Sequence, residues 1–311
     1  MHPGLEHALA RAERFETMVD GRRIVWRRWG DGPSLLLLHG GHGAWNHWVR
    51  NVIPLSHAHA VWAPDMPGYG ESDDLREGGD AQTMAEALSA GLAQLPHASA
   101  RLDVVGFSFG ALVGGHLCAM RRGGVDRFVM VGSAGLGFPR FKGVGLLPWR
   151  RVADDAERRA LHRQNLGMLM LHVPSAIDDL AVALQDDNSL RTRFRSRDLS
   201  RTDALRRLLP ELDARLAGIW GAEDATAAPD VAQRGVLLRS IQPDAWFRVI
   251  EDAGHWVQYE RADAFNQALL QCLDDTRVSA DTRASADARA SADARASTDA
   301  CASAGQRAAG R

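Results

Sequence analysis

The 311-residue sequence has only three cysteines, and no apolar run in it approaches the length of a membrane span. Cys118, Cys272 and Cys301 lie far apart and form no CxxC pair, so we expect neither a disulfide framework nor a structural zinc site. The first 20 residues contain no continuous apolar stretch, which argues against a signal peptide. We therefore expect a cytoplasmic protein without a membrane partner.

An excess of charge of one sign is also lacking. The chain has 37 basic and 39 acidic residues, a net charge of −2, and Lys142 is its only lysine. This balance gives no electrostatic reason to expect a nucleic-acid partner. The spacing of histidine and cysteine fits no metal site, so we expect no metal and no other cofactor. The expected partner is a small-molecule substrate.

Large apolar side chains become scarce after Leu273. From Ser279 a six-residue unit recurs as SADTRA, SADARA and SADARA, and residues 276–311 contain no aromatic side chain. Such a segment cannot bury enough surface to offset the entropy of ordering it. We predict a globular domain over residues 1–275 and a disordered, low-complexity tail over residues 276–311, with a partner-binding tail as the alternative.

Short apolar runs recur along the body and predict strands. Arg14–Val19 and Arg22–Trp29 flank Asp20-Gly21, a dipeptide suited to a two-residue hairpin turn. The near-continuous runs that follow are typical of strands buried on both faces of a parallel sheet. They are Leu35–Leu38, Val61–Ala63, Leu102–Val105, Phe128–Val131, Leu216–Trp220 and Trp246–Ile250. Their alternation with helical patterns predicts a doubly wound α/β fold with a mostly parallel sheet.

The segment 133–214 contains no good strand and interrupts this alternation. Ser175-Ala176-Ile177-Asp178 is a capping-box pattern before apolar residues at helical spacing. A second helix is expected around Leu205 and Leu209, ending at Pro210. We predict a helical cap over about 133–214, inserted before the penultimate strand, with the core at about 14–132 and 215–275.

The strongest catalytic signal is Gly106-Phe107-Ser108-Phe109-Gly110. A predicted strand directly precedes it and a helical pattern, Ala111–Met120, directly follows. A strand-to-helix turn this tight needs glycines on both sides of the serine, because a β-carbon there would clash with neighbouring backbone. The turn predicts Ser108 as a nucleophile at the carboxyl edge of the sheet.

A serine hydroxyl needs a positioned base before it can attack. Among the 12 histidines, His255 is favoured by chain order, since it follows the last strand and precedes the last helix. The acid that orients the base is expected after Leu216–Trp220, where Glu223 and Asp224 are adjacent. Asp224 is the predicted acid, and Glu223 is the alternative.

A glycine-rich turn, His39-Gly40-Gly41-His42-Gly43, directly follows the strand Leu35–Leu38. Such a turn can point backbone N–H groups into a site, and the predicted oxyanion hole consists of the N–H groups of Gly41 and Phe109. The candidate substrate-binding side chains are His42, Phe107 and Trp256.

Together these motifs resemble those of serine hydrolases with the α/β-hydrolase fold, over roughly residues 14–275. The motifs are LLLLHGG (35–41), APDMPGYGESD (63–73), GFSFG (106–110), WGAED (220–224) and GHWVQYERADAFN (254–266). The resemblance implies an α/β-hydrolase domain and a Ser108–Asp224–His255 triad. Serine at position 108 distinguishes the chain from the branches that use an aspartate nucleophile. Asp65, Pro67, Gly68 and Gly70 match the family's structural loop motif, to which we assign no chemistry.

Within that fold, the HGG turn, WVRNVIPL and GHWVQYE are similar to the carbon–carbon bond hydrolases of aromatic meta-cleavage pathways. Those enzymes typically carry Asn before the serine, where this chain has Phe107. Arginines crowd one segment of the predicted cap, either as a solvated helix face or as a clamp for a substrate carboxylate. They are Arg191, Arg193, Arg195, Arg197 and Arg201.

We predict an enzyme, a Ser–His–Asp hydrolase that forms an acyl-enzyme on a small, largely apolar, ester-type substrate. Carbon–carbon bond hydrolysis is the alternative reaction. It must first ketonise a dienol, which calls for additional polar groups, and Phe107 supplies an apolar face instead. The alternative from another class is a hydrolase scaffold that binds a ligand without turnover, and an intact triad with both oxyanion turns argues against it.

Overall fold

The computed structural model describes residues 2–96, 101–139 and 145–274. The chain divides into two compact units, residues 1–269 and 270–311. In the second unit residues 270–274 are described, and they are helical. The predicted tail at 276–311 lies outside the described residues, and the domain boundary at residue 275 stays a prediction. Every helix within the described ranges is too short or too polar to cross a bilayer.

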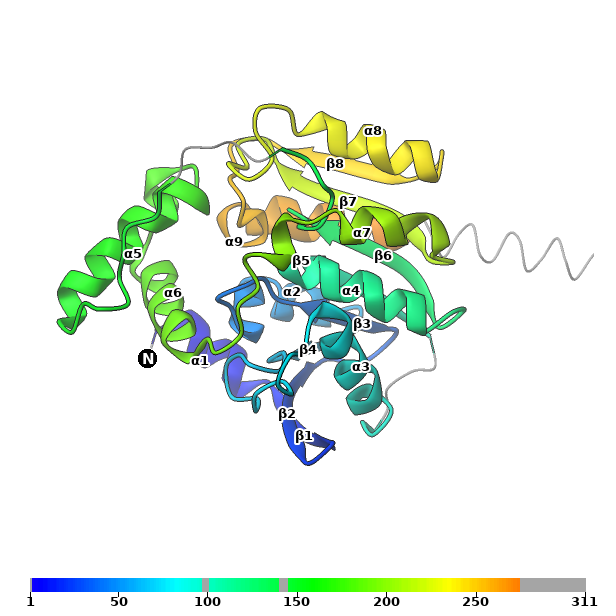
Figure 1. The fold of residues 1–311 in the computed structure, drawn as a ribbon, viewed down its shortest axis with the longest axis horizontal. Coiled ribbons are helices and arrows are strands. Elements are labelled where there is room, and N and C mark those ends of the chain that lie inside the picture. The colour runs from blue at the N-terminus through cyan, green and yellow to red at the C-terminus, as the bar shows by residue number, and fades with distance from the viewer. Residues whose placement is uncertain (1, 97–100, 140–144, 275–311) are drawn as a thin grey trace, which may run out of the picture. The chain divides into compact units, whose positions relative to one another are not determined.

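An eight-stranded sheet runs through the first unit (Figure 1), in the order β1-β2-β4-β3-β5-β6-β7-β8. Strands β1–β2 and β2–β4 pair antiparallel, and the other neighbours pair parallel. The predicted mostly parallel α/β sheet is confirmed, and every predicted run lies in a strand. The strands are β1 (Glu13–Val19), β2 (Arg22–Trp29), β3 (Ser34–Leu38), β4 (Ala60–Pro64), β5 (Leu102–Phe107), β6 (Val125–Val131), β7 (Arg215–Gly221) and β8 (Trp246–Ile250).

The sequence explains both kinds of pairing. Asp20 and Gly21 have φ values of 50° and 72°, the left-handed conformation that a two-residue hairpin turn between β1 and β2 requires. All residues of β3 and β4 are buried, which is why they appear as uninterrupted apolar runs rather than as alternating ones.

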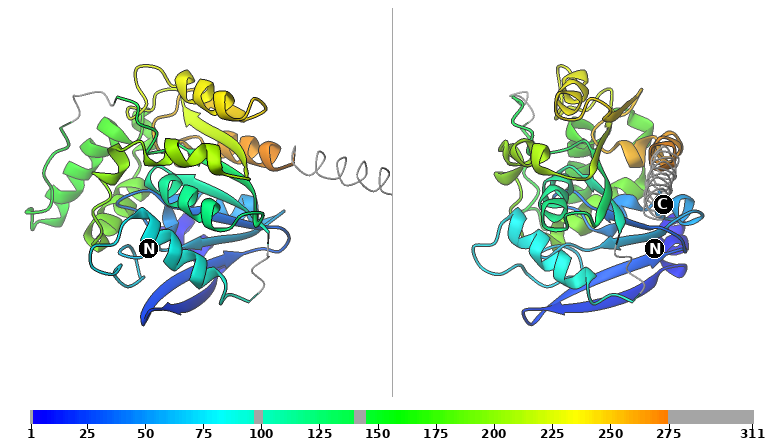
Figure 2. Two further views of the ribbon diagram at one scale, coloured as in Figure 1. Left: turned by 45° about the vertical axis from the view of Figure 1, so that its right-hand side comes forward. Right: turned by 90° about the vertical axis from the view of Figure 1, so that its right-hand side faces the viewer.

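Helices cover both faces of the sheet. α3 (Ala81–Leu92), α4 (Phe109–Met120) and α8 (Ala232–Ile241) lie on one face, and α2 (Val52–Ser56) lies on the other (Figure 2). Side chains from α3 and α4 join Leu36, Val104 and Phe128 of the sheet in one buried apolar cluster. α1 (Pro3–Ala10) precedes the sheet, and α9 (Val257–Glu260) follows it.

The segment between β6 and β7 is helical, as predicted, and contains α5 (Asp155–Leu169), α6 (Asp179–Arg191) and α7 (Ala204–Leu208). We call residues 133–214 the insertion; α5 and α6 lie beyond the carboxyl ends of the strands (Figure 1). One predicted boundary is wrong. α6 begins at Asp179 and not at Ser175, because Asp178 is its N-cap and accepts a hydrogen bond from the N–H of Ala181. Residues 174–176 form a separate 3₁₀ turn.

Candidate active site

Ser108 occupies the sharp turn between β5 and α4. Its φ of 51° and ψ of −114° are rare for a residue with a side chain. A Cβ atom at Gly106 would lie 2.5 Å from Cα of Ala111, and one at Gly110 would lie 2.4 Å from the carbonyl oxygen of His39. The two flanking glycines therefore permit the turn that presents the Ser108 hydroxyl at the carboxyl end of β5.

His255 and Asp224 reach Ser108 from the loops after β8 and β7. His255 Nε2 lies 3.0 Å from Ser108 Oγ, and His255 Nδ1 lies 2.9 Å from Asp224 Oδ2. Asp224 is 1% exposed and His255 is 4% exposed. Because Nδ1 faces a carboxylate, we assign the ring proton to Nδ1, which leaves Nε2 able to accept the serine proton. The structure thus brings together the three residues that the sequence singled out.

Thr226, which the sequence analysis missed, fixes the second oxygen of Asp224. Its backbone N–H and its Oγ1 hydroxyl both donate to Asp224 Oδ1, each at 2.8 Å. Burial by itself raises the pKa of the Asp224 carboxyl, but His255 and Thr226 outweigh it and lower the pKa below its ordinary value. Glu223, the alternative acid, is exposed. The geometry favours Asp224.

The glycine turn after β3 passes beside Ser108. A Cβ atom at Gly40 would lie 3.3 Å from Ser108 Cβ, and one at Gly41 would lie 4.0 Å from Phe109 Cβ. Phe109 is the first residue of α4, so its N–H has no acceptor within the helix. The Gly41 N–H makes no hydrogen bond to another described residue. Both N–H groups that the sequence predicted are available at the turn next to Ser108.

Two buried histidines hold this glycine turn. His39 Nε2 accepts a hydrogen bond from the N–H of Met66 at 3.0 Å, and its Nδ1 lies 2.8 Å from the Gly40 carbonyl. His47 Nδ1 accepts from the N–H of Gly40 at 3.2 Å. Burial lowers the pKa of His39 to about 4, and lowers the pKa of His47 well below its ordinary value. Both rings are therefore neutral at pH 7 and serve as acceptors for backbone N–H groups.

The three candidate substrate-binding residues take different positions. His42 is partly exposed, and its ring lies 6.4 Å from that of Trp149 in the insertion. Burial, followed by the positive charges around it, lowers the pKa of His42 to about 4. Phe107 is fully buried with its ring 5.0 Å from that of His255, and Trp256 is fully buried as well. Contact of these three residues with a substrate stays a prediction.

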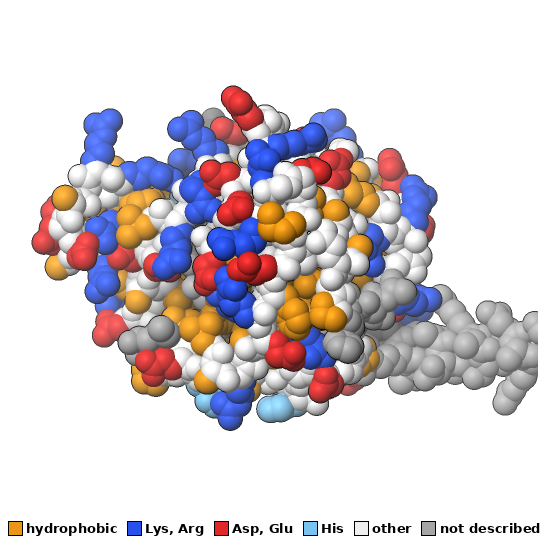
Figure 3. Space-filling model, turned by 90° about the horizontal axis from the view of Figure 1, so that it is seen from below, with side chains coloured by type: hydrophobic (Ala, Val, Ile, Leu, Met, Phe, Trp, Pro, Cys, Tyr) orange, Lys and Arg blue, Asp and Glu red, His pale blue; other side chains and the backbone are white. Residues whose placement is uncertain are grey.

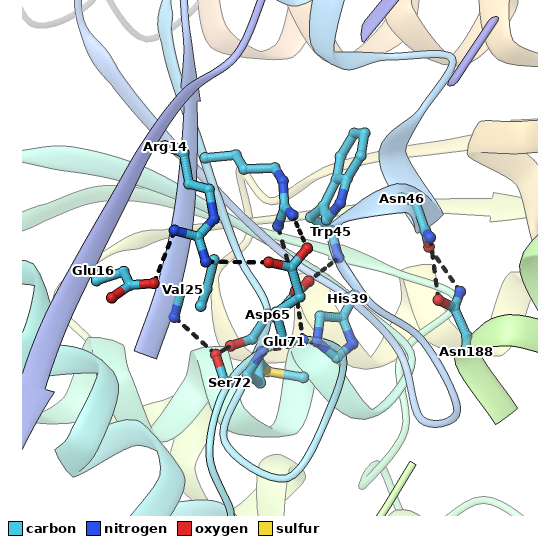
Figure 4. Close-up of polar contacts among 12 residues, drawn as sticks. Arg14, Glu16, Val25, His39, Trp45, Asn46, Asp65, Glu71, Ser72 and Asn188 are labelled. Atoms are coloured by element: carbon cyan, nitrogen blue, oxygen red, sulfur yellow. Dashed lines mark hydrogen bonds and ion pairs between the residues drawn. The ribbon is translucent and has the colours of Figure 1, made fainter. Parts of the chain in front are cut away.

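Asp65, to which the sequence motif assigned no chemistry, joins loops next to the site (Figure 4). Its carboxylate accepts hydrogen bonds from the N–H groups of Trp45 and Glu71, at 2.9 and 3.0 Å. Beside it, Asn46 and Asn188 exchange two amide hydrogen bonds of 3.1 and 2.7 Å. This buried pair connects α6 of the insertion to the segment after the glycine turn.

Glu260 makes a second connection between the insertion and the site, and its place in the motif at 254–266 did not indicate this role. Its carboxylate accepts from the N–H groups of His172 and Val173 in the insertion, at 3.1 and 2.6 Å. It also accepts from the N–H of Gly254 at 2.6 Å, directly before His255. One buried carboxylate therefore joins the insertion to the loop that carries the candidate base.

The arginine-rich segment does not form the predicted solvated helix face. Arg191 ends α6, because Thr192 takes an extended conformation with φ −75° and ψ 120°. Arg191 and Arg193 are in ion pairs with aspartates. Arg195 and Arg197 make no ion pair with another residue that the structure describes. The alternative role, a clamp for a substrate carboxylate, stays a prediction.

The face that carries the β1–β2 hairpin shows charges of both signs with small apolar patches between them (Figure 3). A pocket of about 240 Å³ opens there between the hairpin and α3, and it is lined by none of the three residues Ser108, Asp224 and His255. Within the described ranges, no group of three or more histidine, cysteine or acidic side chains could hold a metal ion.

A serine on a strand-to-helix turn, contacted by a histidine from the loop after the last strand of a mostly parallel sheet, defines the α/β-hydrolase class. Residues 35–268 match the alpha/beta hydrolase family, and the chain belongs to that family. The resemblance stated from the sequence motifs is confirmed.

Two relatives and one solved structure illustrate the likeness. The chain is 30% identical over 272 residues to the dihydrolipoyllysine-residue acetyltransferase component of the acetoin cleaving system of Pseudomonas putida, covering 82% of this chain and 68% of that protein. It is 29% identical over 272 residues to the 2-hydroxy-6-oxo-6-phenylhexa-2,4-dienoate hydrolase of Burkholderia cepacia, covering 78% and 88%. These relatives are enzymes, as predicted for this chain. The meta-cleavage product hydrolase of Pseudomonas fluorescens IP01 has the same fold, with a TM-score of 0.66 and 21% identity over 84% of this chain and 97% of that one.

Proposed function

We propose that the chain is a serine hydrolase that cleaves small, largely apolar carboxylic esters through an acyl-enzyme. The supporting observation is the line of contacts from Ser108 Oγ to His255 Nε2, at 3.0 Å, and from His255 Nδ1 to Asp224 Oδ2, at 2.9 Å. Such a line activates a hydroxyl that is otherwise a weak nucleophile.

The reaction proceeds in two halves. His255 Nε2 takes the Ser108 proton while Oγ attacks the ester carbonyl, and the N–H groups of Gly41 and Phe109 stabilise the oxyanion. The imidazolium, stabilised by Asp224, gives its proton to the departing alkoxide and leaves an acyl group on Ser108. His255 then deprotonates a water molecule that attacks this acyl group, after which the carboxylic acid departs and Ser108 regains its proton.

Substitution of the nucleophile tests the proposal. Ser108→Ala should abolish both hydrolysis of 4-nitrophenyl butyrate and labelling by a fluorophosphonate, with an unchanged circular dichroism spectrum. Ser240→Ala is the matched control, because its hydroxyl bonds only within α8, to the carbonyl of Leu237. Equal labelling of the wild type and Ser108→Ala would refute the nucleophile. A wild-type protein that is neither labelled nor active would favour the ligand-binding alternative.

Carbon–carbon bond hydrolysis is the second candidate, and the dienoate hydrolase of Burkholderia cepacia favours it, since it aligns with this chain over 88% of its own length. Against it stands Phe107, a fully buried apolar side chain at a position where the ketonisation step calls for a polar group. Values of kcat/KM for 2-hydroxy-6-oxo-6-phenylhexa-2,4-dienoate and for a panel of esters decide between the two. A preference of about 100-fold or more for the dienoate over every ester, nearly 3 kcal/mol of transition-state stabilisation, would replace the ester proposal.

A further inference from the structure

A short segment of the insertion, residues 193–197, returns to the core next to the glycine turn. The N–H of Arg193 donates to the carbonyl of Gly68 at 2.9 Å. The ring of Phe194 lies 6.1 Å from that of Tyr69 and 5.7 Å from that of Phe109. Backbone and aromatic contacts therefore fix the segment over the loop that follows β4.

These contacts place the side chain of Ser196 against the glycine turn. Ser196 is 6% exposed. A Cβ atom at Gly41 would lie 2.4 Å from Ser196 Oγ and 4.0 Å from Phe109 Cβ. The Ser196 hydroxyl thus lies beside the two residues whose N–H groups form the proposed oxyanion hole.

A second buried hydroxyl, that of Tyr69, lies close to Ser196. The ring of Tyr69 contacts that of Phe194, two residues before Ser196. Burial raises the pKa of Tyr69 above its ordinary value, and the Ser196 hydroxyl opposes that rise. Their geometry nevertheless falls short of a hydrogen bond, and the Tyr69 hydroxyl has no partner among the described residues. The Ser196 hydroxyl also makes no hydrogen bond within the described ranges.

A buried hydroxyl without a partner destabilises a fold, and most such groups in proteins are paired. The unpartnered Tyr69 hydroxyl, beside the hydroxyl of Ser196, next to the oxyanion turn and close to the rings of Phe109 and Phe194, is suited to a ligand oxygen. Each hydroxyl can donate and accept, and the aromatic surroundings favour an uncharged oxygen over a carboxylate.

We propose that Ser196 and Tyr69 form a specificity subsite that binds a hydroxyl or keto oxygen on the acyl portion of the substrate, close to the scissile carbonyl. The inference rests on the proposed function, since it uses the position of the oxyanion turn relative to Ser108. It narrows the substrate class from small esters in general to esters of hydroxy or keto acids.

The test compares 4-nitrophenyl butyrate with the 4-nitrophenyl esters of 2-hydroxybutyric and 3-hydroxybutyric acid. The wild type should prefer one of the hydroxy esters by about tenfold in kcat/KM, the effect of one added hydrogen bond. This preference should fall toward unity in both Ser196→Ala and Tyr69→Phe. Ser240→Ala serves as the control that keeps the preference of the wild type. A preference that persists in both variants would overturn the subsite.

Two other outcomes are distinguishable. An equal loss of kcat/KM on all three esters in Ser196→Ala would make Ser196 an additional oxyanion donor and would overturn its role in specificity. A wild type that hydrolyses no ester and resists fluorophosphonate would refute the proposed function instead.

The subsite is then tested by calorimetric binding of the same esters to Ser108→Ala. Tighter binding of a hydroxy ester, lost when Ser196→Ala is added, would support the subsite, and equal binding would refute it.

Discussion

Replacing Asp224 by asparagine is expected to inactivate the protein because the backbone determines which way the new amide points. In the wild type the N–H of Thr226 donates to Asp224 Oδ1, and His255 Nδ1 faces Oδ2. The Thr226 N–H can only donate, so the carbonyl oxygen of the new asparagine side chain must take the Oδ1 position. Its NH₂ group then faces His255 Nδ1.

An NH₂ group at that position reverses the tautomer of His255. Nδ1 must accept a hydrogen bond, so the ring proton moves to Nε2, the atom that has to accept the Ser108 proton. In serine proteases this reversal lowers kcat by about 10⁴, equivalent to about 5 kcal/mol of transition-state stabilisation. Thr226→Ala should not rescue the variant, because the backbone N–H that orients the amide remains.

The assay is kcat for a 4-nitrophenyl ester, measured alongside the melting temperature to show that the variant is folded. Glu223→Gln is the matched control, since it makes the same chemical change at an exposed position in the same loop, and it should retain activity. A folded Asp224→Asn protein with kcat within about tenfold of the wild type would contradict the tautomer argument. A larger loss in Glu223→Gln would move the acid to Glu223.

The remaining predictions concern pH and the loop of the candidate base. Because His255 must be neutral to act as the base, kcat/KM should fall toward acidic pH, and a flat profile down to pH 5 would contradict that role. His39 has a pKa of about 4 in the folded chain against about 6.5 when unfolded, so between these values the unfolded chain binds more protons and stability falls with falling pH. His39 alone should lower the free energy of unfolding by about 2 kcal/mol between pH 7 and pH 5, and His42 and His47, whose pKa values burial also lowers, should add to that loss. Equal stability in urea at both pH values would refute this prediction. Glu260→Gln keeps one acceptor oxygen for three N–H donors, so it should lower kcat by about tenfold and the melting temperature by several degrees. Glu251→Gln, at an exposed position, is its control. Equal kcat values and equal melting temperatures for the two variants would refute the role of Glu260 in holding the His255 loop.

The sheet and the serine turn could be predicted from the sequence because both depend on neighbouring residues. Strands buried on both faces, such as β3, need an apolar side chain at every position, and this leaves a visible run. The turn at Ser108 needs Gly106 for a local reason, because a Cβ atom there would clash with Ala111, whereas Gly110 is required by the distant carbonyl of His39 at the end of β3. His255 and Asp224 followed from chain order, once the serine was placed.

The missed elements carry weaker or non-local signals. α5 is a largely polar helix with few buried residues, so it has no clear apolar stripe. Its N-cap, Asp154, accepts a hydrogen bond from the N–H of Glu157, and this aspartate was a sequence signal for the start of the helix. Contacts such as Glu260 with Val173 and Ser196 with Gly41 join residues far apart in the chain, and no periodicity reports them. Side-chain roles that depend on such contacts can be assigned only from the three-dimensional structure.

Among the places where the insertion contacts the site, two segments differ in what they control. Residues 170–173 hold the His255 loop, since the N–H of Trp256 donates to the carbonyl of Met170 at 2.7 Å and Glu260 spans the junction. Residues 193–197 contact the loop after β4 and the glycine turn, where Ser196 lies against Gly41. A change in the first segment alters the position of the base, whereas a side-chain change at Ser196 leaves the contacts of His255 untouched. Substrate preference can therefore vary at the second segment while the geometry of the base is retained.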